Sequence, residues 1–240
     1  MSFDIAGKTI LVTGANRGIG RAIVETFLEH GARKMIAAVR SPESAQPLID
    51  AHGDRIEVTQ MDLGDAKSIQ AAANGVDQVD MVINNAAILE NCSPLDENAA
   101  DLWDLQSHIN VNGLLHVARA FTSHLKTSSG VFAQVNSSAA MRCSARFSIY
   151  AATKAAAYLI CQGLKEEFGA MSVRMMSVHP GPMHTDMAVQ AKIEDVAEPP
   201  ETVAKDILEA LKSEKFLVFS GSVAGAVGEA YADFAKAYIE

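Results

Sequence analysis

Two side chains that could exchange a proton lie four residues apart in the segment Ser148–Lys154, SIYAATK. On a helix this spacing brings the phenol of Tyr150 and the ammonium of Lys154 to one face, one turn apart. A phenol ordinarily loses its proton near pH ~10, and a fixed positive charge nearby lowers that pKa. The pair could therefore donate and accept a proton near neutral pH. Taken alone, the same spacing also describes a surface contact with no chemistry.

A glycine-rich stretch, Thr13–Gly20 (TGANRGIG), follows an apolar segment and precedes a helical one. Glycines let the backbone turn tightly and approach a pyrophosphate. The helix that begins near Gly18 offers free N–H groups and a positive dipole end to phosphates. Turns need glycine too, but a position between a strand and a helix is the context that dinucleotide binding requires. The stretch therefore predicts a dinucleotide site.

The end of the second expected strand indicates which dinucleotide fits. An NAD site places a carboxylate there for the ribose hydroxyls, whereas this chain has Ala37–Ser41 (AAVRS), with no acid. Arg40 and Arg17 could grip a 2′-phosphate from two sides, because a guanidinium binds phosphate oxygens in a forked geometry. We therefore expect NADP(H) rather than NAD(H), the alternative being two solvated surface arginines. Asp62, after the third strand, could accept a hydrogen bond from the adenine amino group or cap the next helix.

Short apolar runs alternate with longer amphipathic segments along the chain. The expected strands are 9–12, 34–39, 55–60, 81–83, 131–135, 173–178 and 216–219. The expected helices are 18–30, 43–52, 67–73, 102–125, 149–168 and 201–213, with a last helix after the seventh strand. This alternation implies parallel β-α-β units with right-handed crossovers. Near-continuous apolar strands fit a sheet that is covered on both faces.

The fold class that follows is α/β, in one domain. We predict a single doubly wound Rossmann-type domain over residues 1–240, with a seven-stranded parallel sheet flanked by helices on both faces. No Pro- or Gly-rich linker divides the chain.

Composition excludes several classes of function. The chain has 240 residues, 49% of them hydrophobic, which allows a large core and argues against disorder. Its net charge of −9 argues against general nucleic-acid or anionic-membrane binding, since both need a basic surface. The three cysteines lack C-x-x-C spacing, which favours a reduced, cytoplasmic protein without a metal. We expect no signal peptide and no membrane span, because neither pattern occurs.

Together these features resemble the short-chain dehydrogenase/reductase family, in its ordinary-length branch, over almost the whole chain. The family motifs occur here in order: TGxxxGxG as Thr13–Gly20, NNAG as Asn84–Ala87 with Ala87 in place of glycine, the helix asparagine as Asn110, YxxxK as Tyr150 to Lys154, and PG as Pro180–Gly181. The extra methyl group of Ala87 could slightly reshape the cofactor site without abolishing binding.

The resemblance implies a catalytic set and a cofactor-binding set, with no metal. The catalytic residues would be Asn110, Ser137, Tyr150 and Lys154. The cofactor-binding residues would be Gly14, Asn16, Arg17, Gly18, Ile19, Gly20, Arg40, Asp62, Leu63, Asn85, Ala86, Tyr150, Lys154, Pro180, Gly181 and Thr185. Ser137 lies thirteen residues before the tyrosine, the usual gap in the family, and Ser138 stays open as the alternative.

The implied reaction is reversible hydride transfer between NADP(H) and a carbonyl compound or alcohol. Ser137 would orient the substrate oxygen, and Tyr150 would give or take its proton. Lys154 would lower the pKa of the phenol and bind the nicotinamide ribose, and Thr185 would bind the carboxamide. Asn110 would bend its helix and hold a water that links the lysine to solvent. The alternative for Asn110 is a hydrogen bond to its own helix backbone.

The stretch from residue 183 to about 200 is the expected substrate lid. Its apolar residues favour an apolar pocket, or else cover the core: Met183, Met187, Ala188, Val189 and Ile193. The expected partners are a small apolar carbonyl compound or alcohol and further copies of the chain, as a homodimer or homotetramer through helices 102–125 and 149–168. An epimerase or dehydratase would carry a longer C-terminal substrate region. A cofactor-sensing binding protein on the same fold is the alternative function.

Overall fold

Seven parallel strands form one sheet in the computed structural model, which describes residues 3–239. Met1, Ser2 and Glu240 lie outside the described residues. The two ends of the expected 1–240 domain therefore lie outside them, as do the first two residues of the N-terminal segment in which no signal peptide is expected. The strands are β1 (Thr9–Thr13), β2 (Lys34–Val39), β3 (Ile56–Gln60), β4 (Met81–Asn84), β5 (Val131–Val135), β6 (Arg174–Pro180) and β7 (Leu217–Ser220). Each lies within two residues of its expected bounds, so the predicted fold class is confirmed.

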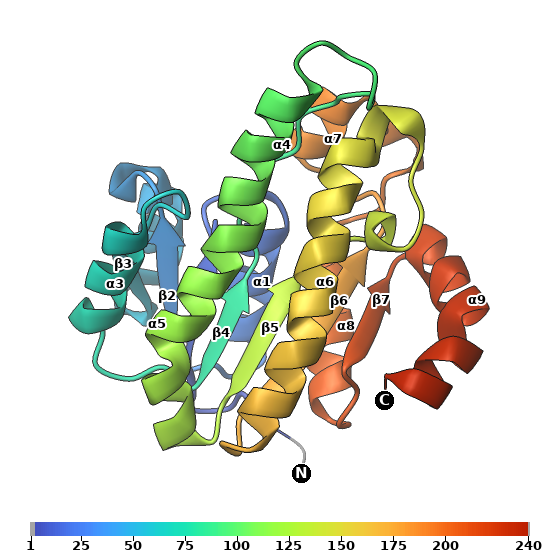
Figure 1. The fold of residues 1–240 in the computed structure, drawn as a ribbon. Helices are drawn as coiled ribbons and strands as arrows, with labels where there is room; N and C mark the ends of the chain where they lie inside the picture. The colour runs from blue at the N-terminus through green and yellow to red at the C-terminus, as the bar shows by residue number, and fades with distance from the viewer. Residues whose placement is uncertain (1–2, 240) are drawn as a thin grey trace.

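The strands lie in the order β3-β2-β1-β4-β5-β6-β7 (Figure 1). From β1 the chain moves outward to one edge of the sheet, then returns to the middle and moves from β4 to the other edge. The direction therefore reverses between β1 and β4, where Leu11 pairs with Val82. At such a switch point the loops after the strands diverge and leave a crevice at the carboxyl ends.

Helices cover both faces of the sheet (Figure 1). They are α1 (Gly18–Glu29), α2 (Gln46–His52), α3 (Ala66–Gly75), α4 (Ala99–Ser107), α5 (Gly113–Ser128), α6 (Ser148–Gly169), α7 (Asp186–Ala191), α8 (Glu201–Leu211) and α9 (Ser222–Tyr238). Helices α1, α2 and α8 pack on one face, and α3, α5, α6 and α9 on the other. Strand side chains alternate between the two cores, with Val12 in the first and Leu11 in the second. No helix in residues 3–239 is long and apolar enough to cross a membrane.

Three helical segments differ from the expectation. The helix expected over 102–125 is α4 and α5 joined by a π-helical turn over His108–Asn112. The helix expected over 43–52 begins as a 3₁₀ turn, Pro42–Ala45, and continues as α2. Pro47 explains this break, because it has no N–H to donate to the preceding turn but is tolerated at the start of a helix. The expected lid contains α7, which its short apolar pattern did not predict.

Candidate active site

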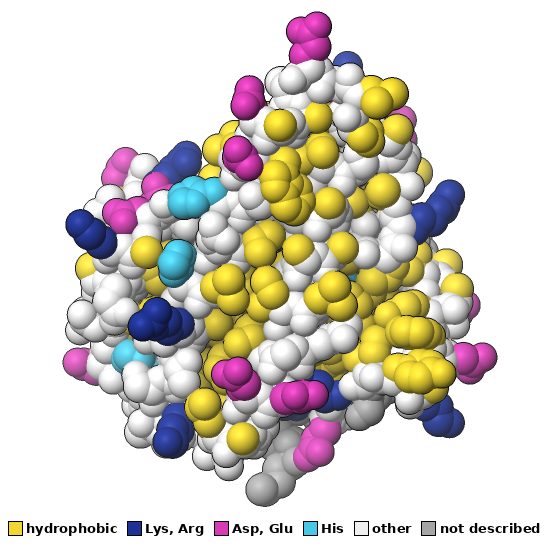
Figure 2. Space-filling model, in the orientation of Figure 1, with side chains coloured by type: hydrophobic (Ala, Val, Ile, Leu, Met, Phe, Trp, Pro, Cys, Tyr) yellow, Lys and Arg dark blue, Asp and Glu magenta, His cyan; other side chains and the backbone are white. Residues whose placement is uncertain are grey.

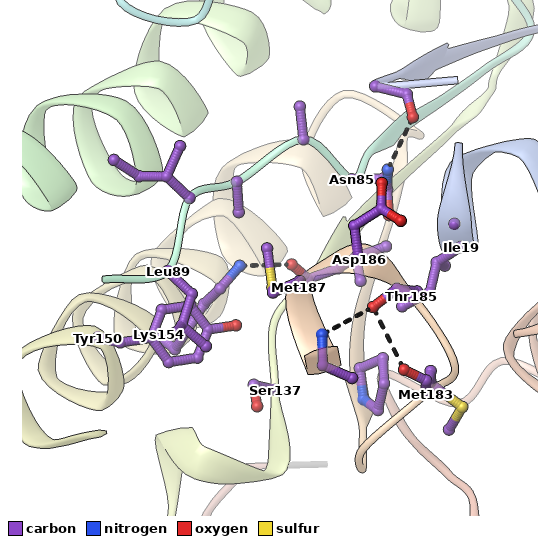
Figure 3. A pocket seen from close by; sticks show the side chains of 18 of the residues that line it. Ile19, Asn85, Leu89, Ser137, Tyr150, Lys154, Met183, Thr185, Asp186 and Met187 are labelled. Carbon is purple, nitrogen blue, oxygen red and sulfur yellow. Dashed lines mark hydrogen bonds between the residues drawn. The ribbon is translucent and has the colours of Figure 1, made fainter. Parts of the chain in front are cut away.

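A cavity of about 960 Å³ opens above the β1–β4 switch point, at the carboxyl ends of the strands. The sequence-predicted site residues that line it are Gly14, Asn16, Arg17, Gly18, Ile19, Arg40, Asp62, Leu63, Asn85, Ala86, Ser137, Tyr150, Lys154, Pro180, Gly181 and Thr185. Gly20 and Asn110 do not line it. Figure 3 shows Tyr150 and Lys154 on one side of the pocket and Thr185 on the other. Segments far apart in the sequence thus meet around one space.

The glycine-rich loop lines the cavity at the N-terminus of α1. Gly14 and Gly18 have φ angles of +64° and +53°, a left-handed conformation that favours glycine. A Cβ atom on Gly20 would lie 2.2 Å from the carbonyl oxygen of Gly14, so only glycine lets α1 pack this closely. Arg17, the N-cap of α1, makes no side-chain capping hydrogen bond. The helix terminus therefore remains available to an anion, which fits a pyrophosphate.

The hydroxyl of Thr13 joins the ends of β1 and β4. It donates to Asn84 Oδ1 at 3.0 Å and accepts from the backbone N–H groups of Asn85 and Ala86, each at 2.9 Å. The side-chain amide of Asn85 donates in turn to the Thr13 carbonyl at 2.9 Å. The sequence motif predicted Thr13 only as part of the glycine-rich loop and did not predict that its hydroxyl joins β1 to β4. A buried threonine at a strand end needs hydrogen-bond partners, and that requirement could have pointed to it.

The two arginines expected at a 2′-phosphate have different surroundings. Arg40 is exposed at the end of β2, whereas Arg17 forms an exposed ion pair with Asp186 of α7, with 3.0 Å between Nη1 and Oδ2. Asp62 accepts from the backbone N–H of Gly64 at 2.9 Å. The helix-cap alternative for Asp62 is wrong, because Asp65 is the residue that caps α3.

Tyr150 and Lys154 lie side by side on α6 and are both buried. The Lys154 Nζ is 5.7 Å from the centre of the Tyr150 ring and donates to the Val135 carbonyl at 3.0 Å. Burial raises the pKa of Tyr150 to about 12, although a hydrogen bond with the Ser137 side chain lowers it. Burial also lowers the pKa of Lys154 to about 8. The pKa of the phenol is therefore raised rather than lowered as expected, since desolvation outweighs the effect of Ser137.

The two candidate serines both line the cavity, but only the Ser137 side chain lowers the pKa of the phenol. The Ser137 Oγ accepts from the backbone N–H of Ala139 at 3.1 Å. Ser138 begins the short 3₁₀ turn that follows. The geometry thus favours Ser137 over Ser138.

Asn110 lies in the π-helical turn between α4 and α5, behind the cavity wall. Its side-chain amide donates to the Ile88 carbonyl at 2.9 Å and to the Thr153 hydroxyl at 3.1 Å, and its Oδ1 accepts from the Ile88 N–H at 3.0 Å. All three hydrogen bonds go to residues outside the helix of Asn110. The alternative of a hydrogen bond to its own helix backbone is therefore wrong. Asn110 instead connects the loop after β4 with helix α6.

The lid residues surround Tyr150 with apolar side chains. Met187 and Ile193 line the cavity and pack in a small cluster with Tyr150. Val189 does not line it and is 59% exposed, so its expected place in the pocket is wrong. The reason is the orientation of α7, which is fixed by Thr185: its Oγ1 caps the helix by accepting from the Ala188 N–H at 3.3 Å and donates to the Met183 carbonyl at 3.2 Å (Figure 3).

Known proteins are similar to this chain in sequence and in structure. A family model described as short chain dehydrogenase matches residues 8–195. L-xylulose reductase from Bos taurus is 30% identical over 80% of this chain and 78% of its own length. A short chain dehydrogenase from Burkholderia cenocepacia J2315, solved with NADP, is 28% identical with a TM-score of 0.89, covering 98% of this chain and 97% of that one.

A more distant structure shares the fold. A short chain dehydrogenase/reductase from Burkholderia phymatum, solved with NAD, is 19% identical with a TM-score of 0.84, over 99% of this chain and 97% of that one. The family model spans most of the chain and includes the glycine-rich loop, Tyr150 and Lys154. The chain therefore belongs to the short-chain dehydrogenase family.

Proposed function

We propose that this oxidoreductase transfers a hydride between NADP(H) and a ketone or aldehyde and its alcohol, with Tyr150 as the proton donor and acceptor. The observation that carries the proposal is the grouping of Ser137, Tyr150 and Lys154 in the wall of a cavity that also contains the glycine-rich loop. A proton-transfer group and a phosphate-binding loop around one space are the two components that nicotinamide chemistry requires of a protein.

The residues present fit a nicotinamide dinucleotide. Gly14 and Gly18 with the N-terminus of α1 would hold the pyrophosphate, because the missing side chains let phosphates approach the backbone. Lys154 would bind the nicotinamide ribose, and the Thr185 hydroxyl would bind the carboxamide. When bound, the nicotinamide supplies or accepts the hydride.

The protein's own contribution is control of one proton at the Tyr150 hydroxyl. With a pKa of about 12, the phenol is protonated at neutral pH and can donate to the substrate oxygen during reduction. Lys154, with a pKa of about 8, stays cationic at neutral pH and would stabilise the phenolate left behind. Ser137 would hold the substrate oxygen beside the phenol. This charge state favours carbonyl reduction as the direction in which the tyrosine is ready to act.

Substitution of the pair tests the mechanism. Tyr150→Phe should bind NADPH normally but lose about 100- to 10 000-fold in kcat, because general acid–base catalysis contributes that range. Lys154→Ala should weaken both turnover and NADPH binding. Turnover is measured by NADPH absorbance with a panel of ketones and aldehydes, and binding by fluorescence titration. Near-full kcat in Tyr150→Phe would refute the mechanism, and tight NADPH binding by the unmodified protein without turnover of any carbonyl would favour the sensor.

The preference for NADP(H) rests on Arg17 and Arg40, with no carboxylate at the end of β2. Arg40→Asp should shift the ratio of kcat/KM for NADPH and NADH toward NADH, because a carboxylate repels a 2′-phosphate and can accept from ribose hydroxyls. Lys212→Asp reverses a charge on an exposed residue outside the cavity and should leave the ratio unchanged. An unmodified protein that prefers NADH would contradict the proposal.

Other features support narrower proposals. Apolar side chains around Tyr150 support an apolar carbonyl substrate and a lid over residues 183–200.

Hydrophobic side chains gather over α5 and α6 in Figure 2, and the large exposed ones on helices α4 to α6 include Trp103, Leu105, Leu115 and Leu159. This surface supports a homodimer or homotetramer. The three free cysteines support the proposal of a cytoplasmic protein, and the single continuous sheet supports a single domain. A light-scattering mass near the 25.5 kDa of one chain would contradict the oligomer.

A further inference from the structure

His179, a fully buried residue of β6, has no part in the mechanism above. Its Nδ1 lies 3.1 Å from the carbonyl oxygen of Ser137, and its Nε2 lies 2.8 Å from the hydroxyl of Ser177. The imidazole therefore contacts the backbone of Ser137, a residue that lines the same cavity as Tyr150. A buried imidazole with both nitrogens engaged is a defined connection between β6 and the active-site serine.

The chemistry of the partners determines which nitrogen carries the proton. Burial lowers the pKa of His179 to about 4, the charge of Lys154 lowers it further and the Ser137 hydrogen bond raises it, so the ring is neutral at neutral pH. A neutral imidazole has one N–H, and a carbonyl oxygen can only accept. The proton must therefore be on Nδ1, pointing at Ser137, and Nε2 must accept from the Ser177 hydroxyl.

The same reasoning extends the chain of hydrogen bonds by one residue. The side-chain amide of Asn136 donates to the Ser177 Oγ at 2.8 Å, which leaves the serine hydroxyl free to donate to the imidazole. All three bonds then run in one direction, from Asn136 through Ser177 and His179 to the Ser137 carbonyl. Chains with a single direction polarise each member and strengthen the last bond.

Aromatic rings hold the imidazole in its plane. Tyr158 meets it edge-on, with 4.9 Å between ring centres and an angle of 89°, and Phe219 stacks on it at 5.2 Å and 26°. One residue before Ser137, the backbone N–H of Asn136 donates to the Val178 carbonyl at 2.7 Å. The backbone at Ser137 is thus held by hydrogen bonds at two neighbouring positions, and both involve β6.

We propose that His179 is a positioning residue that holds Ser137 against Tyr150 through a hydrogen bond from its Nδ1–H to the Ser137 carbonyl. The inference rests on the proposed function of Ser137 and Tyr150. A shift of the serine would misplace the substrate oxygen relative to the phenol, and misplacement by about 1 Å can cost on the order of 100-fold in rate.

Two amide substitutions separate positioning from simple filling of space. The nitrogen of Asn at position 179 would occupy the place of Nδ1 and keep the bond to Ser137, whereas Gln would reach the place of Nε2 and keep only the bond to Ser177. His179→Asn leaves the larger void and should be the less stable, since the cost of a core truncation grows with the cavity. Positioning therefore predicts the opposite order for turnover and for stability.

The measurements are kcat, the Kd for NADPH and the melting temperature of each variant. We expect kcat to fall about 10- to 100-fold in His179→Gln and by less than about threefold in His179→Asn, with the Kd for NADPH within about twofold in both. Equal kcat values, or kcat values that follow melting temperature, would overturn the inference. An unmodified protein without carbonyl reduction would instead refute the proposed function.

The unmodified protein allows a second test that needs no variant to fold and no activity. NMR of protein with ¹⁵N-labelled histidine reports which ring nitrogen carries the proton. We expect His179 to be neutral with the proton on Nδ1 at neutral pH. A proton on Nε2, or a charged ring, would overturn the hydrogen bond on which the inference depends.

Discussion

Replacing Thr13 by valine should loosen the active site without changing its shape. Valine has nearly the volume of threonine but no hydroxyl, so Thr13→Val removes three hydrogen bonds, one to Asn84 and two from the backbone N–H groups of Asn85 and Ala86. Each contributes about 1 kcal/mol net, which gives a loss of about 3 kcal/mol. Asn85 and Ala86 line the cavity, where water can satisfy part of the lost bonding, so the expected loss is about 2–3 kcal/mol.

The assay is thermal unfolding followed by NADPH titration. For a chain of this size each kcal/mol shifts the melting temperature by about 2–4 °C, so Thr13→Val should melt roughly 4–12 °C lower and bind NADPH more weakly. Thr13→Ser is the matched control, because it keeps the hydroxyl and loses one buried methyl group, at a cost of about 1 kcal/mol. A valine variant that melts at or above the serine variant would refute the reasoning, since shape rather than hydrogen bonding would then hold β1 to β4.

Three further predictions concern the glycine-rich loop, Lys154 and Arg17. Gly20→Ala should destabilise the protein by about 1–3 kcal/mol in denaturant unfolding, because its methyl group would meet the Gly14 carbonyl, whereas Gly163→Ala, with no atom within 4 Å, should be neutral or stabilising. The kcat/KM for NADPH should fall as pH rises through about 8, where Lys154 loses its charge. A profile that stays flat to roughly pH 10 would contradict the lowering of the Lys154 pKa by burial. Asp186→Asn frees Arg17 from its ion pair and should tighten NADPH more than NADH, and equal effects on both would remove the 2′-phosphate from the explanation.

The fold could be predicted from the sequence because most strands are short apolar runs buried on both faces, a pattern that local composition displays, although β3 is partly exposed. The π-helical turn at Asn110 could not, because its causes lie far along the chain. The Asn110 amide is held by Ile88 and Thr153, which are 22 and 43 residues away in sequence. A run of helix-compatible residues from 102 to 125 therefore predicts one continuous helix, and tertiary hydrogen bonds decide otherwise.

The site was predictable in its residues but not in its electrostatics. Motif spacing placed Ser137, Tyr150 and Lys154 around one cavity, and the geometry favours the serine that spacing had favoured. The sequence displays the charge of Lys154 but not the burial of the phenol, and burial is the larger effect on the pKa of Tyr150. Val189 illustrates the same limit, because its exposure depends on how the Thr185 cap orients α7.

The central place of β1 in the sheet has a consequence for how the nascent chain folds. Strand β1 is synthesised first and pairs with β2 soon afterwards, but its other neighbour, β4, follows much later, as the 71 residues between Thr13 and Asn84 illustrate. At about 5–20 residues per second, this interval lasts roughly 4–14 s on the ribosome. During that time the edge of β1 that pairs with β4 in the folded protein has no partner, and such apolar strand edges are sites of intermolecular pairing. Synthesis of β4 therefore ends the period in which this chain is most exposed to misassembly.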